Sequence, residues 1–329
     1  MRNVFVTGAT SMLGVALIEE CIRQNTHVYA LIRPSSGNLR RLPDSDMLTV
    51  IECELSDLRG LTCFGLPAEI DAFYHFGWQH TTKAGRNSPG LQAENILYSL
   101  EAVRLAAKLG CRKFIGAGSQ AEYGIHRTPA TSPSTHPEPV TPYGISKLAA
   151  GRLCSHEAGK LGLSFAWVRI FSVYGENDSP ESMISTILRS LMKNEHCALT
   201  QGIQNWDYLY SLDAGRAFYM LGANGSGTYC LGSGQARSIR SYVEDMKAAA
   251  GSTSELGFGE IPYENGTPPG MCADISALTR DTGFKPSVSF KDGIANMIAN
   301  RRGGGGQILR ASVIALMLLF RNEEEKNAA

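Results

Sequence analysis

The chain opens with a short apolar run, residues 3–7, that ends in a glycine turn and leads into a helical pattern over residues 12–24. A second run of β-forming residues follows at 27–32. This order predicts a strand, a helix and a parallel strand, and so restricts the fold to a sheet covered by helices. The turn before the helix presents free backbone N–H groups at the positive end of a helix dipole, which predicts a pyrophosphate site.

Apolar strands continue to alternate with helical stretches as far as about residue 175, which predicts an α/β fold with a Rossmann-type, doubly wound parallel sheet. We expect this domain to span residues 1–175, with a later return near 205–222. Beyond residue 175 the apolar and helical stretches become shorter, and we expect residues 176–301 to form a smaller, mainly substrate-binding lobe. The expected strands are 3–7, 27–32, 48–52, 71–76, 113–117 and 164–169, and the expected helices lie near 12–24, 91–109 and 142–161.

We expect the last residues, 302–329, to form a glycine-rich break followed by a tail helix of unknown role. The apolar stretch 308–320 includes Arg310 and is too short to span a membrane. Over its whole length the chain balances 31 Lys and Arg against 31 Asp and Glu, so no overall charge attracts a nucleic acid or an acidic membrane. Eight scattered cysteines without a C-x-x-C pair, and a first strand without a signal peptide before it, favour a cytoplasmic protein without a metal site.

Three residues form a candidate catalytic set: Ser119, Tyr143 and Lys147. Tyr143 and Lys147 are four residues apart, which places them on one face of a helix. A phenol is a poor base at neutral pH, and a nearby ammonium lowers its pKa, so the pair can move a proton beside a hydride. The Ser119 hydroxyl can then hold the substrate oxygen. The alternative is a half-buried helix tyrosine with a solvated lysine as its neighbour.

Several segments match a known family in the right order: TGATSMLG at 7–14, YHFG at 74–77, GSQAEYG at 118–124, RIFSVYG at 169–175 and WDYLYSLD at 206–213. With the Tyr143 to Lys147 segment and two late matches at 273–276 and 282–286, they make residues 3–299 resemble the extended short-chain dehydrogenase/reductase superfamily, in its nucleotide-sugar epimerase/dehydratase branch. One residue departs from the pattern, because Ser11 stands where the family turn has a glycine.

The resemblance implies an NAD(P) cofactor and the residues that hold it. Glu54 matches the residue that contacts the adenine, and Arg33 follows the second strand, where an arginine accommodates the 2′-phosphate of NADP. We therefore expect NADP in preference to NAD; the alternative for Arg33 is a solvated basic loop. The full set of expected cofactor-binding residues is Gly8, Thr10, Ser11, Met12, Leu13, Gly14, Arg33, Glu54, Leu55, Phe76, Gly77, Tyr143 and Lys147.

The resemblance also implies a nucleotide-diphosphate sugar as substrate and a homodimer. Family 4,6-dehydratases carry an acid and a base directly after the position of Ser119, where this chain has Gln120 and Ala121. We therefore expect a 4-ketoreductase or a 4-epimerase and not a 4,6-dehydratase. The alternative is a cofactor-sensing or scaffold protein on the same fold.

The expected substrate contacts come from both parts of the chain: Gln120, Asn177, Trp206 and Arg240, with Arg237 as an alternative cation. Trp206 takes the place of a family arginine that pairs with the substrate phosphates, so it predicts stacking in place of a charge contact. The alternative is that Trp206 only fills the boundary of the lobe. The nucleotide base and the sugar are not readable from the sequence.

Overall fold

The computed structural model describes residues 1–34, 36–61, 66–67, 69–125, 131–263 and 270–302. Its strands are β1 (Asn3–Thr7), β2 (His27–Ile32), β3 (Leu48–Glu52), β4 (Ala72–His75), β5 (Lys113–Ser119), β6 (Ser164–Ile170), β7 (Ser172–Tyr174), β8 (Cys197–Leu199), β9 (Asn205–Tyr210), β10 (Gly227–Leu231), β11 (Ala236–Ser238) and β12 (Leu256–Phe258). Its helices are α1 (Met12–Arg23), α2 (Lys83–Arg86), α3 (Pro89–Lys108), α4 (Pro142–Lys160), α5 (Met183–Met192), α6 (Ser211–Asn224), α7 (Ile239–Ala250), α8 (Ser276–Thr282) and α9 (Phe290–Arg302), with short 3₁₀ turns η1 (Leu39–Arg41), η2 (Leu55–Gly60) and η3 (Gln120–Tyr123).

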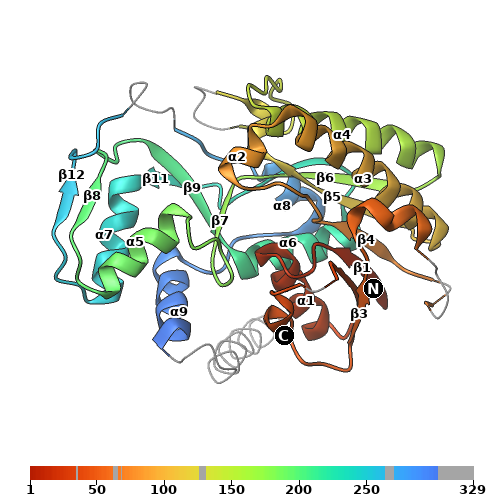
Figure 1. Cartoon of the computed structure of the whole chain (residues 1–329), viewed down its shortest axis with the longest axis horizontal. Helices are drawn as coiled ribbons and strands as arrows, with labels where there is room; N and C mark the ends of the chain where they lie inside the picture. The colour runs from red at the N-terminus through yellow and green to blue at the C-terminus, as the bar shows by residue number, and fades with distance from the viewer. Residues whose placement is uncertain (35, 62–65, 68, 126–130, 264–269, 303–329) are drawn as a thin grey trace.

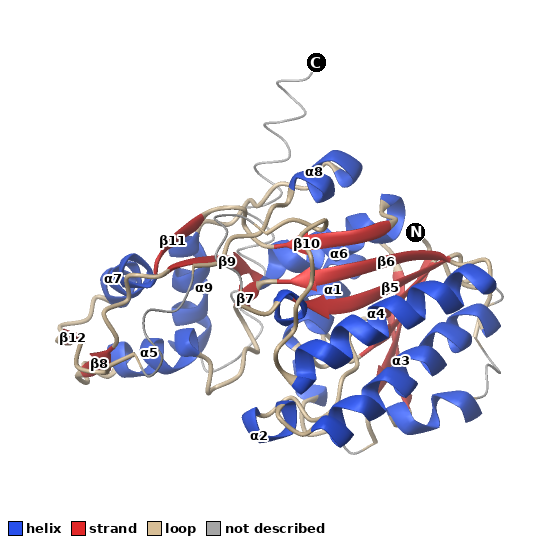
Figure 2. Ribbon diagram, turned by 90° about the horizontal axis from the view of Figure 1, so that it is seen from above, coloured by secondary structure: helices blue, strands red, loops and turns tan. Residues whose placement is uncertain are grey.

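The large sheet has seven strands in the order β10-β6-β5-β4-β1-β2-β3, and all of its pairings are parallel. The chain order reverses between β1 and β4, which is where an open α/β sheet binds its ligand. Helices α1 and α6 cover one face, and α3 and α4 cover the other (Figures 1 and 2). The expected Rossmann-type doubly wound fold is confirmed.

Each face of the sheet has its own apolar core, because the strands are buried on both sides. Leu17 and Ile18 of α1 pack with Phe218 of α6 on one face. On the other face, stacked phenylalanines run across neighbouring strands, with Phe73 and Phe114 5.5 Å apart between ring centroids. This packing fixes the carboxyl ends of the strands, from which the site is built.

A smaller lobe lies at the far end of the molecule (Figure 1). It contains a three-stranded sheet, β11-β9-β7, a two-stranded sheet, β12-β8, and helices α5, α7 and α9 around a third core. The chain does not stay there after residue 175. Strand β10 joins the large sheet beside β6, and α6 and α8 also pack in the core of that sheet. Helix α6 lies in the region of the later return expected near 205–222, and β10 and α8 also pack with the large sheet.

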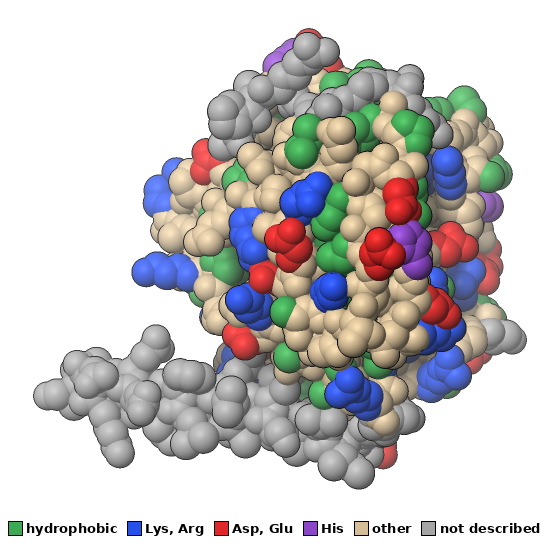
Figure 3. Space-filling view, turned by 90° about the vertical axis from the view of Figure 1, so that its left-hand side faces the viewer, with side chains coloured by type: hydrophobic (Ala, Val, Ile, Leu, Met, Phe, Trp, Pro, Cys, Tyr) green, Lys and Arg blue, Asp and Glu red, His purple; other side chains and the backbone are tan. Residues whose placement is uncertain are grey.

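The strand and helix ranges expected from the sequence agree with β1 to β6, α1, α3 and α4 to within about two residues. The predicted tail helix at 308–320 lies outside the described residues. Figure 3 shows acidic and basic side chains intermixed over the end of the lobe. Ion pairs in the lobe join Arg237 to Asp245 and His196 to Glu260. Within the described ranges, no helix is long and apolar enough to cross a membrane, and no cluster of three or more side chains could hold a metal.

Candidate active site

The turn after β1 is packed too tightly for any side chain at its glycines. Gly8 has a φ of 66°, and a β-carbon there would lie 2.7 Å from the backbone of Phe76 and Gly77 at the end of β4. A β-carbon on Gly14 would lie 2.5 Å from the Gly8 carbonyl oxygen. The turn therefore lies directly against β4, and the first turn of α1 faces the same edge of the sheet.

Ser11, the departure from the family turn, caps α1. Its backbone is extended, with a φ of −72°, so the residue needs no glycine conformation. Its hydroxyl accepts a hydrogen bond from the Gly14 N–H at 3.0 Å. Because α1 has no acidic residue in its first turn, the helix end remains suited to an anion. Thr10, Met12 and Leu13 complete this turn, and the Thr10 carbonyl accepts from Arg41 at 3.3 Å.

The opposite wall of the expected cofactor site comes from β2, β3 and β4. Leu55 packs against Gly77, since a β-carbon on that glycine would meet the Leu55 side chain at 2.8 Å. Phe76 packs edge-on against Phe218, with 4.8 Å between centroids. Glu54 precedes the η2 turn, and Arg33 is exposed just after β2. The tight glycine turn and the apolar wall beside it fit a dinucleotide lying across this edge of the sheet.

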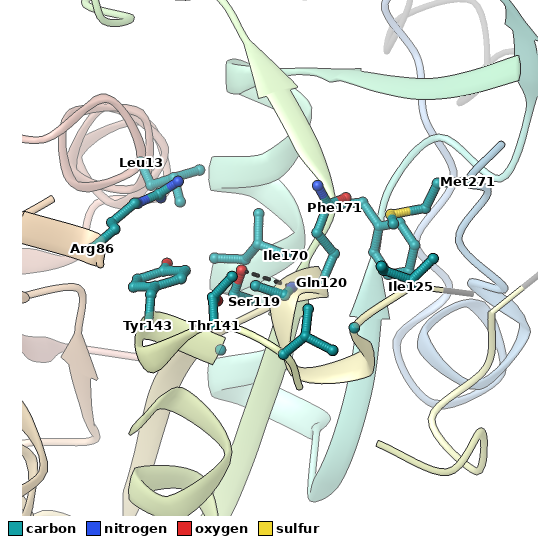
Figure 4. A pocket seen from close by; sticks show the side chains of 14 residues that line it. Leu13, Arg86, Ser119, Gln120, Ile125, Thr141, Tyr143, Ile170, Phe171 and Met271 are labelled. Atoms are coloured by element: carbon teal, nitrogen blue, oxygen red, sulfur yellow. Dashed lines mark hydrogen bonds between the residues drawn. The ribbon is translucent and has the colours of Figure 1, made fainter. Parts of the chain in front are cut away.

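The catalytic set predicted from the sequence is brought together where β5 ends and α4 begins. The Thr141 hydroxyl caps α4 by accepting from the Gly144 N–H at 3.1 Å, which places Tyr143 in the first helical turn. Ser119 and Tyr143 line a cavity of about 420 Å³ (Figure 4). Lys147 lies one turn further along α4, is buried, and is not part of the described lining of this cavity.

Burial dominates the electrostatics of the set. It raises the pKa of Tyr143, while the Arg86 charge and a hydrogen bond from Ser119 act in the opposite direction. Burial lowers the pKa of Lys147 to about 7, with the Glu122 carboxylate opposing this shift. The Lys147 ammonium donates to the Ala117 carbonyl at 2.7 Å. It is therefore a fixed group whose charge changes near neutral pH.

A buried carboxylate behind Ser119 was not anticipated from the sequence. Glu122 accepts hydrogen bonds from the Ser119 N–H at 2.8 Å and the Trp167 indole N–H at 2.9 Å. Its other oxygen pairs with Arg169 at 2.8 Å. The carboxylate is fully buried, so its bonds fix the backbone of Ser119 against β6. Glu122 belongs to the matching segment 118–124, but only the fold reveals its three partners.

Two further residues next to the set, Trp78 and Arg86, were also not predicted from the sequence. Trp78 places its ring 3.6 Å from the Lys147 ammonium and edge-on to Tyr143. Arg86 lies over the Tyr143 ring and lines the cavity (Figure 4). The sequence offers one indication of Trp78, which directly follows the matching segment 74–77. It offers no indication of Arg86, which lies in an exposed four-residue helix outside the matching segments.

The four residues expected to bind substrate do not all line the same cavity. Gln120 lines the cavity, and its buried Oε1 has no hydrogen-bond partner among the described residues. Asn177, Trp206 and Arg240 are absent from the described lining of that cavity. Asn177 lies beside the α1 turn, where its carbonyl accepts from Arg41 at 3.4 Å. In the smaller lobe, the Trp206 indole donates to Ser172 at 2.7 Å and Arg240 stacks on Phe258 at 3.8 Å.

The tight glycine turn lies at the switch point of a parallel sheet, with Ser119 at the end of β5 and Tyr143 and Lys147 at the start of α4. These features define an NAD(P)-dependent enzyme of the extended short-chain dehydrogenase/reductase type. Residues 4–232 match the model of the NAD dependent epimerase/dehydratase family. The chain therefore belongs to this family, and the resemblance inferred from the sequence is confirmed.

Relatives and solved structures cover nearly the whole chain. An uncharacterized UDP-glucose epimerase of Bacillus subtilis (strain 168) is 23% identical, covering 90% of this chain and 97% of its own. A dTDP-glucose 4,6-dehydratase of Actinoplanes sp. is 25% identical, with the same coverage. The crystal structure of the UDP-glucose 4-epimerase of Thermus thermophilus in complex with NAD superimposes with a TM-score of 0.79 at 22% identity, over 92% of this chain and 99% of that one.

His75 generates a prediction for stability against acid. The ring is 3% exposed, with Nδ1 2.8 Å from the Thr7 hydroxyl and Nε2 3.2 Å from that of Ser99. Burial, assisted by the Lys147 charge, lowers its pKa from 6.5 to about 3. Below pH 6.5 this histidine is therefore protonated in the unfolded chain but stays neutral in the folded protein. The free energy of unfolding decreases as the pH falls below 6.5. From there to about pH 5 the loss from this residue is about 2 kcal/mol.

Urea unfolding measured across this pH range, with His75→Gln beside the unchanged protein, tests the assignment. The variant should lose about 2 kcal/mol less over the same interval. His156→Gln, on the exposed side of α4, is the matched control. Equal acid sensitivity of His75→Gln and the unchanged protein would show that His75 does not carry this effect.

Proposed function

We propose that the protein transfers a hydride between NAD(P) and the C4 carbon of a nucleotide-linked sugar, as a 4-ketoreductase or a 4-epimerase. The observation that carries this proposal is the cavity lined by Ser119 and Tyr143, with Lys147 buried one turn further along α4 and no carboxylic acid at Gln120 or Ala121. Retention of the complete catalytic set favours an enzyme over a cofactor sensor or a scaffold.

In the proposed mechanism the protein holds the substrate and moves one proton. The Ser119 hydroxyl orients the substrate oxygen, and the Tyr143 phenol gives a proton to that oxygen or takes one from it. Lys147 places a positive charge behind the tyrosine and holds the nicotinamide ribose. A bound nicotinamide supplies or accepts the hydride. Gln120, whose buried oxygen is without a partner in the described part of the chain, can accept a hydrogen bond from a sugar hydroxyl.

Dehydration needs a further acid and base beside the substrate. Gln120 and Ala121 supply neither group. Glu122 comes next in the chain, but its oxygens are taken by Arg169, Trp167 and the Ser119 N–H, and it is fully buried. This arrangement supports a reductase or epimerase, although the family also contains dehydratases such as the Actinoplanes relative.

The finer cofactor preference rests on Arg33. Its exposed side chain follows β2, at the end where a 2′-phosphate is recognised, so we propose NADP over NAD. The Thermus structure contains NAD, which makes a direct comparison of the two cofactors decisive.

For the substrate we propose a nucleotide-diphosphate sugar, held by Gln120 at the sugar and by Asn177, Trp206 and Arg240 at the nucleotide end. Trp206 is half-buried on β9, the strand between β7 and β11, and its register partner on β11 is Arg237. This pairing supports a stacked base beside a cation. A nucleotide sugar that binds Trp206→Ala and the unchanged protein equally well would remove Trp206 from the site.

We also propose a cytoplasmic homodimer. The seven described cysteines are free thiols, as expected in a reducing compartment, and cell fractionation tests this location. Leu97 on α3 and Ile145 and Leu153 on α4 are 63%, 52% and 46% exposed, which offers an apolar surface across two neighbouring helices. Light scattering should give the mass of a dimer, and Leu153→Asp should lower it. A monomeric mass for the unchanged protein would contradict this proposal.

Tyr143→Phe should reduce turnover by about 10²–10⁴-fold, because it removes the group that exchanges the proton. Binding of the cofactor should change little. The assay first screens UDP-, GDP-, CDP- and dTDP-sugars for binding by calorimetry, with and without NADPH, and then follows nicotinamide absorbance with the sugar that binds. Tyr98→Phe, on α3 and away from the cavity, is the control. Near-normal turnover by Tyr143→Phe would refute the proposed mechanism.

Arg33→Ala should weaken NADP(H) binding roughly tenfold or more while leaving NAD(H) binding nearly unchanged, because a charge-assisted bond to the 2′-phosphate is lost. Calorimetric titration of both cofactors measures the two affinities. Arg2→Ala, exposed at the opposite end of β1, is the control. Equal affinity of the unchanged protein for NADP(H) and NAD(H) would remove this role from Arg33.

A further inference from the structure

Arg86 places a guanidinium group over the face of Tyr143. Its Cζ atom lies 4.2 Å from the centre of the Tyr143 ring, and Figure 4 shows its side chain lying across that ring at the wall of the cavity. The residue ends α2, whose start is capped by the Thr82 hydroxyl. Gln92 of α3 donates to the carbonyls of His80 and Gly85, each at 3.0 Å. These bonds fix the short helix that carries Arg86.

Lys147 lies further from the same ring than Arg86 does. Its ammonium lies 5.9 Å from the Tyr143 centroid and is held by the Ala117 carbonyl and the face of Trp78. Its burial lowers its pKa to about 7, so its charge is partly lost at neutral pH. An arginine stays charged throughout the range in which proteins fold. Arg86 is thus both the nearer cation and the permanent one.

We propose that Arg86 is a positioning residue whose permanent charge over the Tyr143 ring sets the protonation equilibrium of that tyrosine. The inference rests on the proposed function, because Tyr143 is the acid/base of that reaction. It assigns to Arg86 a part of the task that the resemblance gives to Lys147 alone.

The charged groups that face Tyr143 come from three elements: Arg86 from α2, Lys147 from α4 and Glu122 from η3. Glu122 raises the pKa of Tyr143, in the same direction as burial, and its charge is compensated by Arg169. Arg86 and the Ser119 hydrogen bond lower that pKa. Among these groups Arg86 is exposed, so it can be replaced without opening the core.

The sign of the effect follows from the charge. A cation beside a phenol favours the phenolate, and opposite charges at this range shift a pKa by about 1–3 units. Because Arg86 is exposed to solvent, we expect the lower end of that range. Its removal should therefore raise the pKa of Tyr143 by about 1 unit.

Ultraviolet titration of tyrosinate absorbance in the cofactor-free protein tests the inference without a substrate. The difference between the unchanged protein and Tyr143→Phe isolates the titration of Tyr143, and the same difference is measured in an Arg86→Gln background. We expect the midpoint to rise by about 1 pH unit in Arg86→Gln and to recover in part in Arg86→Lys. Lys83→Gln, exposed on the same short helix but not lining the cavity, should leave it unchanged. An unchanged midpoint in Arg86→Gln would overturn the inference, whatever reaction the protein catalyses.

A second measurement separates this role from substrate binding. With an active nucleotide sugar, the pH profile of kcat in the oxidation direction should move to higher pH by the same amount in Arg86→Gln, with KM little changed. A raised KM with an unmoved profile would instead make Arg86 a ligand for a substrate anion, and the inference would be wrong.

Discussion

Strands β1 and β4 are neighbours in the large sheet, although two strands, a helix and their connections separate them in sequence. Their contact is close enough that the Gly8 turn after β1 touches the backbone of Phe76 and Gly77 after β4. Because every strand in the sheet is parallel, the ends of β2, β3 and β5 open on the same edge. The cofactor turn, the apolar wall and Ser119 are all placed by this one arrangement. A side chain at Gly8 would separate the two strands at the point where the site begins.

Buried carboxylates connect parts of the chain that are distant in sequence. Glu122 joins the end of β5 to β6 through Trp167 and Arg169. Asp207 on β9 accepts from the backbone N–H groups of Ser233, Gly234 and Ala273, and Asp213 on α6 accepts from those of Ser287 and Val288. Each of the three side chains is at most 1% exposed. Acids with this many backbone partners act as connectors between loops, because an unpaired buried N–H group costs about 1–3 kcal/mol.

The sequence was sufficient to predict the parallel sheet, since periodicity and turn residues are local properties that the strands from β1 to β6 express clearly. The Tyr143–Lys147 spacing likewise predicted one helix face. The local pattern of residues 227–231 does not place β10 in the large sheet, because these five residues follow several lobe elements and only the long-range pairing with β6 assigns them. Arg86 was missed for the same physical reason: its position over Tyr143 depends on how α2 is fixed to α3. The proposed roles of Arg33, Asn177, Trp206 and Arg240 depend on a ligand and stay predictions.

The path of the chain between the two parts has a consequence for dissecting the protein. After leaving the large sheet at β6, the chain enters the smaller lobe, returns as α6 and β10, leaves again through β11 and α7, and returns as α8 before ending the described region in α9. Phe218, Tyr229 and Phe284, from these late returns, are buried in the same core as the first strand. No single cut within the described ranges therefore yields two fragments that each retain a complete core. The two parts therefore form one folding unit. A truncated protein that keeps only the first six strands would expose the face of the sheet that α6 covers.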